Sequence, residues 1–544
     1  MLPCHRLMAS ENELGEEKKI TRRNYLKYAA GAVVAAAAAG AGIYYYSTTA
    51  PGPPTPTTTT TVAPPTTTPT GIVVTGATSA ERALNVAKQY MQLNNVPAGY
   101  KIVAAIPPPA KGQWDPKYYK EFLDGTGLVV ETVEMPFEQI RSKLTAEATA
   151  KSGAVDLFQI IPANWIADFA EMGLAQNLDN YVQKYDPEFD HGPNRIIPSK
   201  MENENKYLGH WYASTLDYDV WFLQYRSDIM EDPKEKDAFK SQYGRELKPP
   251  ETWKEVADIC EFFYRPEEGR WGWWSLKNPV WELIEYKMRL ASRGVHYFDD
   301  DMHPLINSDP AIEALQDEVD IQKFQPPESY TGFWDQMYDF VWKGKVVMTC
   351  AWTSMKHFAY AQGVGDLLKG ALSPGYPTKD GRIRHGGMLA LDNTLFVNAH
   401  SKHPELAYLF MQYYLDADVS ANWLPDPGGW YEPFRMSHFD STRYPELQKM
   451  WGADFFSIML DNAANWFVPD LTMEGATRYD DALDRQVNAV LKGGADPKKA
   501  MDSVAAEWEI ITDEIGRDKQ KEVWALIKDL QYGAKLKELM DPNL

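Results

Sequence analysis

Neighbouring carboxylates are the first residues of this sequence that could do chemistry. Asp217 and Asp219 lie two positions apart, residues 299–301 are three consecutive Asp, and residues 186–192 read DPEFDHG. Paired carboxylates can serve a glycosidase, and clustered acidic oxygens can bind Ca²⁺. However, 76 of the 544 residues are acidic, so such neighbours also arise by chance. We therefore predict no bound metal and no cofactor.

Sequence motifs of known catalytic sites are missing. The chain has no Gly-x-Ser-x-Gly, His-Glu-x-x-His or Cys-x-x-Cys motif, and no phosphate-binding Gly-x-x-x-x-Gly-Lys loop. Its ten His residues show no ligand spacing. The sequence therefore predicts that the protein is not an enzyme. A membrane-anchored glycoside hydrolase, with two cleft carboxylates beside aromatic rings, stays open as an alternative.

Aromatic residues are abundant, with 18 Trp, 30 Tyr and 21 Phe. Sugars present apolar C–H faces ringed by hydroxyls, so aromatic rings cover the faces while polar side chains satisfy the hydroxyls. Ligands of α/β folds bind beyond the carboxyl ends of buried strands. The aromatic residues that follow predicted strands are thus candidates for a carbohydrate site, with core packing as the alternative role. These residues are Trp114, Trp165, Trp211, Tyr212, Trp352 and Trp430.

Two glycine-rich stretches add further candidates. Trp430 lies in PGGWYEPFR, with Arg435 close by. Gly386 and Gly387 would let backbone N–H groups approach a ligand, because no Cβ stands in the way. We therefore count Arg435, Gly386 and Gly387 among the candidate ligand-binding residues. The alternatives are a hinge-packing ring at Trp430 and an ordinary turn at the Gly pair.

The elements that would position these residues begin with alternating strands and helices. Apolar runs predict strands over 100–106, 128–135 and 154–161, and residues 137–150 predict a helix with Ile140, Leu144 and Ala148 on one face. The strands are too uniformly apolar for a half-exposed sheet. This pattern indicates βαβ units around a buried, largely parallel sheet.

The rest of the body reads as more helical. Thr252 and Glu255 have capping-box spacing at the start of one helix, and residues 344–352 read as a buried strand. A short helix is predicted from Glu81 to Leu93, as a packing extension or a connector. Two C-terminal helices carry apolar stripes, formed by Leu483, Val487, Val490 and Leu491, and by Met501, Val504, Trp508 and Ile511.

The N-terminal residues resemble an export and anchoring device. Arg22 and Arg23 lie in TRRNYLK, which is similar to the twin-arginine export signal. The uncharged run that follows would span about 28 Å as a helix, close to the ~30 Å hydrocarbon core. A Thr/Pro tract then resembles an extended stalk. We predict a cytoplasmic leader over 1–27, an apolar signal or anchor helix over 28–46 and a disordered stalk over 47–70, which together would hold an extracytoplasmic protein at the membrane surface.

Charge and cysteine content limit the partners. The net charge of −21 repels phosphate backbones and anionic lipid headgroups, so we predict no nucleic-acid partner. Cys4 lies in the predicted leader. Cys260 and Cys350 lie in apolar contexts, where two buried free thiols are favoured over a disulfide.

Four stretches, taken in order, are similar to the extracellular solute-binding proteins of family 1, which serve carbohydrate-type ABC importers. A fifth stretch, residues 217–230, matches that family's crossover strand. The resemblance covers about residues 100–515, with Val347 in place of the usual Ala and an insertion around 187–205. The four stretches are YFDDDMHPLINSDPAIEALQ (297–316), KGKVVMTCAWTSM (343–355), GGMLALDNTLFVNAHSKHPELAYLFMQYYL (386–415) and YDDALDRQVNAVLKGGADPKKAMDSVAAEWEII (479–511).

This resemblance implies an α/β, two-lobed fold of the periplasmic-binding-protein type II class, whose discontinuous lobes close on a ligand. It also implies that Trp352 faces the ligand and that Asp219 accepts hydroxyl hydrogen bonds. The expected protein is a monomer that captures a sugar or oligosaccharide and delivers it to an ABC importer permease. A peptide or polyamine is the alternative solute. The implied parts are a connector over 71–99, one lobe over 100–215 plus 383–420, and a second over 216–380 plus 425–535.

Overall fold

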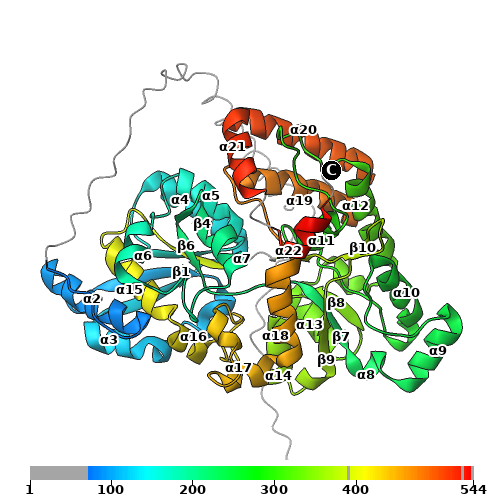
Figure 1. Ribbon diagram of the computed structural model, residues 1–544, viewed down its shortest axis with the longest axis horizontal. Coiled ribbons are helices and arrows are strands. Elements are labelled where there is room, and N and C mark those ends of the chain that lie inside the picture. Colours follow the sequence, from blue (N-terminus) through cyan, green and yellow to red (C-terminus); the bar gives the residue numbers. More distant parts are fainter. Residues whose placement is uncertain (1–70, 389–392, 529–531, 541–544) are drawn as a thin grey trace, which may run out of the picture. The chain divides into compact units, whose positions relative to one another are not determined.

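The computed structural model describes residues 71–388, 393–528 and 532–540 (Figure 1). The predicted leader, apolar helix and stalk therefore lie outside the described residues. No helix within these three ranges combines the length and the apolar character that a bilayer crossing needs.

A five-stranded sheet forms the centre of the first lobe. Strand β1 is parallel to both β2 and β3, which confirms the predicted parallel arrangement at the start of the body. Strand β13 is antiparallel to β3 and β6, because the chain enters this sheet again from the second lobe. The sheet is therefore mixed. In spatial order its strands are β2 (Val129–Glu134), β1 (Lys101–Ile106), β3 (Leu157–Ile160), β13 (Thr394–Val397) and β6 (Ala213–Thr215).

Helices surround this sheet, and α4 buries Ile140, Leu144 and Ala148 as predicted. The predicted N-terminal helix is α2, which packs along α15 although more than 300 residues separate them (Figure 1). Tyr90 Oη lies 3.3 Å from His403 Nδ1 in this contact. The helices of the lobe are α2 (Ser79–Leu93), α3 (Lys120–Thr126), α4 (Phe137–Ala150), α5 (Ile166–Glu171), α6 (Asp179–Tyr185), α7 (Pro198–Lys200), α15 (Pro404–Tyr414) and α16 (Ala417–Trp423).

The second lobe contains a three-stranded sheet in which β7 is antiparallel to both of its neighbours. Its order is β8 (Met348–Ala351), β7 (Phe222–Arg226) and β9 (Leu368–Ala371), and β8 is the strand predicted within 344–352. Three two-stranded pairs complete the described strands. They are β4 (Lys206–Tyr207) with β5 (His210–Trp211), β10 (Tyr376–Pro377) with β11 (Ile383–Arg384), and β12 (Gly387–Met388) with β14 (Phe467–Val468).

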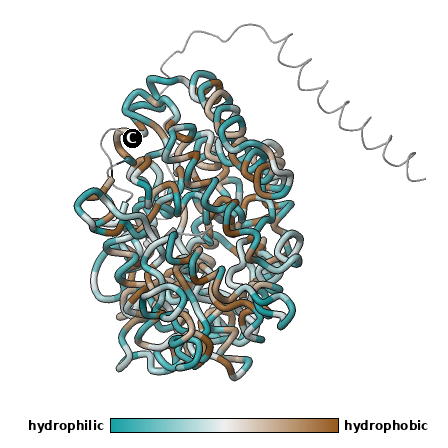
Figure 2. Tube along the Cα trace, turned by 90° about the vertical axis from the view of Figure 1, so that its right-hand side faces the viewer, coloured by the Kyte–Doolittle hydropathy of each residue, from teal (hydrophilic) through white to brown (hydrophobic). Residues whose placement is uncertain are grey.

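Amphipathic helices make up much of the second lobe. Along the Cα trace, hydrophobic and hydrophilic residues alternate (Figure 2). The predicted capping box of Thr252 and Glu255 is present, and the two predicted C-terminal stripes are buried. The helices are α8 (Ser227–Met230), α9 (Pro233–Tyr243), α10 (Trp253–Phe263), α11 (Leu283–Ser292), α12 (Asp309–Ile321), α13 (Trp334–Trp342), α14 (Ser354–Ala361), α17 (Pro445–Trp451), α18 (Ala453–Asp461), α19 (Ala476–Gly493), α20 (Pro497–Ile515), α21 (Arg517–Ile527) and α22 (Ala534–Leu539).

Cys260 and Cys350 are free thiols buried in this lobe, as the sequence favoured. Burial raises the pKa of each thiol well above its usual value, because a thiolate would lose its hydration. Neither group is therefore a reactive nucleophile.

The chain passes between the lobes three times, and hydrogen bonds tie the passages together. The first runs over 216–221 from β6 to β7, the second leads from β11 to β13, and the third lies between α16 and α17. Asn393, in the second passage, donates from Nδ2 to Asp217 Oδ2 and to Asp219 Oδ2, both at 3.0 Å. The backbone N–H of Glu432, in the third, donates to Asp217 Oδ1 at 2.5 Å.

Candidate functional site

A narrow pocket, with a free volume of about 20 Å³, lies where these passages meet the second sheet. Trp352 directly follows β8, Trp334 and Tyr338 belong to α13, and Phe358 belongs to α14. The polar groups of the lining are few compared with its rings. The lining consists of Ile161, Asp219, Trp281, Trp334, Tyr338, Trp352, Ser354, Phe358, Asn393 and Trp430.

The aromatic rings of this pocket support one another. The ring of Trp352 meets Trp221 at a centroid distance of 4.9 Å and an interplanar angle of 88°, and Trp281 at 5.1 Å and 75°. Trp334 stacks on Phe358 with centroids 5.9 Å apart. Such edge-to-face and offset contacts fix the ring orientations. The wall that faces the pocket is therefore set before any ligand arrives.

A second, roomier pocket of about 370 Å³ adjoins the first, with which it shares Ile161 and Trp281. Phe137, Glu138 and Trp165 line it from the first lobe. Residues 278–281 and Phe333 line it from the second lobe. The two pockets together form one cleft between the lobes.

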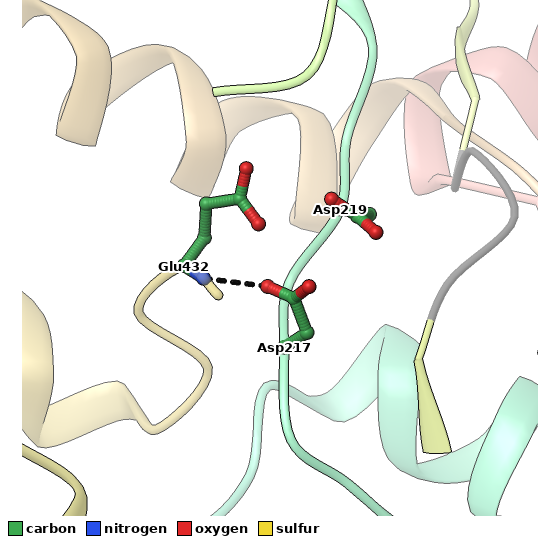
Figure 3. A group of neighbouring side chains, drawn as sticks. All are labelled: Asp217, Asp219 and Glu432. Atoms are coloured by element: carbon green, nitrogen blue, oxygen red, sulfur yellow. Dashed lines mark hydrogen bonds between the residues drawn. The ribbon is translucent and has the colours of Figure 1, made fainter. Parts of the chain in front are cut away.

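Three buried carboxyl groups gather at the base of this cleft, and we call them the acidic cluster: Asp217, Asp219 and Glu432 (Figure 3). One oxygen from each lies within 4.8 Å of the others. The backbone N–H of Ser354 donates to Glu432 Oε1, which ties the third passage to α14. Only Asp219 of the three also lines the first pocket.

Burial dominates the electrostatics of the acidic cluster. It raises the pKa of Asp217, Asp219 and Glu432 above their usual values, and mutual repulsion raises those of Asp219 and Glu432 further. The ammonium of Lys200 opposes this shift at Asp217 and Asp219. Three carboxyl groups so close together cannot all be ionised without a cation, so they hold protons or bind a positive charge.

The structure brings several predicted site residues to the cleft. Trp352, Trp430 and Asp219 line the first pocket. Trp165 lines the second, and its Nε1 donates to Asp480 Oδ2 at 3.3 Å.

The other predicted residues are absent from the lining of both pockets. Trp114 is buried, and its Nε1 donates to Tyr431 Oη at 3.1 Å. Trp211 packs on Phe189, and Tyr212 lies near Tyr207. These three aromatic residues therefore contact the protein interior of the first lobe.

Arg435 and the Gly pair also serve the protein itself. The fully buried guanidinium of Arg435 donates to the carbonyl oxygens of Leu415 and of residues 187, 188 and 194. A Cβ at Gly387 would lie 1.9 Å from Asn462 Oδ1, so the close approach at this glycine is to Asn462. A Cβ at Gly386 would lie 3.1 Å from the backbone oxygen of Met288, which is a tight contact without overlap.

Sequence reasoning missed Glu432, Asn393 and four of the rings of the first pocket, Trp281, Trp334, Tyr338 and Phe358. Glu432 is two positions after Trp430 in PGGWYEPFR, so that stretch contained the missing carboxylate. Asn393 follows Asp392 near the start of β13. No local pattern sets α13 apart from other aromatic helices, so Trp334 and Tyr338 required the tertiary arrangement.

Comparison with known sequences identifies the family. Residues 106–421 match the family described as bacterial extracellular solute-binding protein. The chain belongs to this family, which agrees with the resemblance of its motifs.

Individual relatives are more distant. The chain is 26% identical to the maltotriose-binding protein of Pyrococcus abyssi (strain GE5 / Orsay) over 190 residues, which cover 34% of this chain and 35% of that protein. The aligned part thus spans about a third of the length of this curated relative.

Solved structures share the fold over most of the chain. A solute-binding protein of an ABC transporter from Agrobacterium radiobacter K84, in complex with ribitol, has a TM-score of 0.63 at 19% identity, covering 76% of this chain and 100% of that one. Maltose-bound MalE3 of T. maritima has a TM-score of 0.62 at 20% identity, with the same coverages. At such identities the likeness establishes the two-lobed fold.

Proposed function

We propose that the protein captures a carbohydrate in the cleft between its lobes and delivers it to an ABC importer. The observation that carries this proposal is the first pocket, whose four indole rings stand beside Asp219 and Asn393. Aromatic faces bind the apolar faces of sugar rings, and the polar side chains meet the hydroxyls. The names of the relatives, which bind maltotriose, maltose and ribitol, support the same class of solute.

The family places the protein outside the cytoplasm. We further propose that the twin-arginine-like residues Arg22 and Arg23 direct its export, and that residues 28–46 anchor it while residues 47–70 form the tether. Its partners would then be the permease subunits of the importer, with a single copy of the chain binding the solute. Sequencing the N-terminus of protein taken from the cell surface tests the anchor, because cleavage after residue 46 would contradict it.

Isothermal titration of the purified chain with a panel of sugars and oligosaccharides tests the carbohydrate assignment. We expect saturable binding that Trp352→Ala weakens at least tenfold, or by about 1.4 kcal/mol. Trp508→Ala is the matched control, because Trp508 is an equally buried indole in α20, away from the cleft. Both variants should lose about 3–5 kcal/mol of stability, and only the first should lose affinity.

Binding of peptides or polyamines without any sugar would contradict the proposal. So would equal affinities of the two variants.

The acidic cluster suggests glycoside hydrolysis as a second candidate function, because glycoside hydrolases use paired carboxyl groups beside aromatic sugar sites. We propose that the protein is not an enzyme. Asp217 already accepts hydrogen bonds at both oxygens, and Glu432 does not line either pocket. No release of chromophore from nitrophenyl glycosides is expected. Turnover that Asp219→Asn abolishes would establish the hydrolase instead.

A further inference from the structure

The acidic cluster contains a buried oxygen that lacks a hydrogen-bond donor. Both oxygens of Asp217 accept hydrogen bonds, and Glu432 Oε1 accepts from Ser354. Glu432 Oε2 has no N–H or hydroxyl donor among the described residues, although the side chain is 0% exposed, and its polar neighbours are the carboxyl groups of Asp217 and Asp219. In Figure 3 its carboxyl group lies beside those of Asp217 and Asp219. A buried carboxylate oxygen without a donor is costly, so either a proton shared with Asp217 or Asp219 or a cation from outside the cluster must compensate it.

The charge around the cluster is also unbalanced. Lys200 is the ammonium whose attraction acts on Asp217 and Asp219, and it also forms an ion pair with Glu204 at 3.1 Å. Among the described residues, Lys200 is thus the cation that the electrostatics of Asp217, Asp219 and Glu204 have in common. Of the described residues that line the first pocket, none is Lys or Arg. The pocket thus presents acidic character to a solute and offers no basic side chain to compensate it.

The walls of the pocket favour a cation as well. The faces of Trp, Tyr and Phe rings attract positive charge through their quadrupole, and Trp is the strongest of the three. Trp281, Trp334, Trp352 and Trp430 all line the pocket with Asp219.

We propose that the solute is an amine-bearing carbohydrate, whose ammonium group lies against Asp219 within the four indoles and compensates the charge of the acidic cluster. This inference rests on the proposed function, since it names the class of sugar that the same cleft selects. The ammonium would donate to Asp219 directly. Asp217 and Glu432, which lie behind Asp219, would strengthen the attraction by their charge.

A divalent metal ion is the competing occupant. Ca²⁺ requires six to eight oxygen ligands, and Mg²⁺ requires a near-ideal octahedron. Asn393 Nδ2 and the N–H of Glu432 already point at three of the six carboxylate oxygens in the cluster. These donors present partial positive charge to the position a metal would take, so an organic ammonium at the open side of Asp219 fits better.

The test is a titration of the full chain with matched sugar series at one pH and ionic strength. Glucosamine, glucose and N-acetylglucosamine differ only at C2, as do their galacto and manno counterparts. The β-1,4-linked disaccharides of the three gluco compounds extend the comparison to a second ring. In at least one series we expect the ammonium sugar to bind tenfold or more tightly than both the hydroxyl and the acetamido sugar.

Two variants test whether the acidic cluster causes the preference for ammonium sugars. Glu432→Gln keeps the shape of the side chain but removes its charge, and Asp219→Asn does the same at the pocket. We expect either variant to reduce ammonium-sugar affinity about tenfold and to change neutral-sugar affinity less. Glu318→Gln is the matched control, because Glu318 is also 0% exposed with oxygens that lack donors, and it lies on α12 away from the cleft. This control should keep the preference for the ammonium sugar.

The outcomes separate this inference from the proposed function. Neutral sugars that bind as tightly as ammonium sugars would overturn the amine assignment and leave a carbohydrate-binding protein. Failure of every ammonium sugar to bind overturns the inference, and failure of all carbohydrates overturns both. Tight binding of CaCl₂ or MgCl₂ that Glu432→Gln abolishes would assign the cluster to a metal ion and contradict the amine.

Discussion

At the residue scale, His438 shows how burial fixes a protonation state next to the third passage. Its Nδ1 lies 3.3 Å from the backbone N–H groups of Phe434 and Arg435, so it accepts from them. Its Nε2 lies 3.1 Å from Ala417 O, to which it donates. The ring is fully buried and neutral, because a proton on Nδ1 would prevent this atom from accepting the two backbone hydrogen bonds. Burial, followed by the charge of Arg435, lowers the pKa of His438 to about 3.

This lowered pKa predicts a loss of stability in acid. Below a pH of about 6.5 the unfolded chain binds a proton at this His while the folded protein does not, so the free energy of unfolding falls as pH falls toward 3. The full contribution is roughly 4–5 kcal/mol, at 1.36 kcal/mol per pKa unit. Denaturant unfolding of wild type and His438→Gln between pH 7 and pH 4 measures it. We expect the variant to be less stable at pH 7, with a difference that narrows in acid.

The raised pKa values of Asp219 and Glu432 have the opposite effect on the free energy of unfolding in acid. The contribution of His438 is therefore measured as a difference between wild type and variant. Those carboxyl groups add stability as the pH falls through their folded-state pKa values. A difference between wild type and His438→Gln that stays constant from pH 7 to pH 4 would contradict the assignment.

Part of the site could be predicted at this scale. Trp352 and Asp219 follow or precede strands that the sequence identifies, so their positions at the strand ends were expected. Glu432 and Asn393 lie in connecting segments, and only the tertiary fold brings them to Asp217. Arg435 illustrates the reverse case. A charged residue near a glycine-rich turn suggested a ligand, yet backbone carbonyl groups occupy its guanidinium.

At the element scale, the N-terminus of α19 is capped by a residue of the other lobe. The helix begins after Gly475, which offers no side chain for a cap. Asp168, from α5, accepts from Gly475 N at 2.6 Å and from Thr477 N at 3.0 Å. A carboxylate at a helix N-terminus satisfies free N–H groups and complements the helix dipole. This contact can exist only while the two lobes are close together.

Asp168→Ala is therefore expected to cost about 1 kcal/mol of stability and to weaken solute binding, because the closed arrangement loses a contact. Asp232→Ala is the matched control. Asp232 caps α9 within the second lobe, through Lys234 N at 2.7 Å and Glu235 N at 3.3 Å. Chemical denaturation and calorimetric titration of both variants test the prediction. Equal affinities in the two variants would show that the α19 cap plays no part in closure.

Local signals explain which elements the sequence predicts well. The capping box at Thr252 and Glu255, and the stripe of α4, are set by neighbours three or four positions apart. The direction of β13 depends on the chain entering the sheet from the second lobe. The cap of α19 is provided by Asp168, a residue some 300 positions away. Neither feature leaves a pattern within its own segment.

At the scale of the whole molecule, the cleft couples two lobes with separate sheets. A solute that touches Trp352 in one lobe and Trp165 or Ile161 in the other stabilises both against unfolding. At a free concentration of 100 times Kd the stabilisation is about 2.7 kcal/mol. In differential scanning calorimetry, the complete unfolding transition should therefore shift to higher temperature when solute is added. A shift of only part of the transition would indicate that the solute contacts one lobe alone.

The three passages between the lobes also determine the order in which a solute is captured. Hydrogen bonds from Asn393 and Glu432 to Asp217 hold the passages side by side, so the lobes can separate cheaply only by bending about an axis that crosses all three. Atoms near that axis move least. The acidic cluster lies there and stays assembled, while rings from opposite lobes, such as Phe137 and Trp281, move apart. An arriving solute therefore finds Asp219 already in place at the base of the cleft, and the aromatic enclosure forms around the solute afterwards.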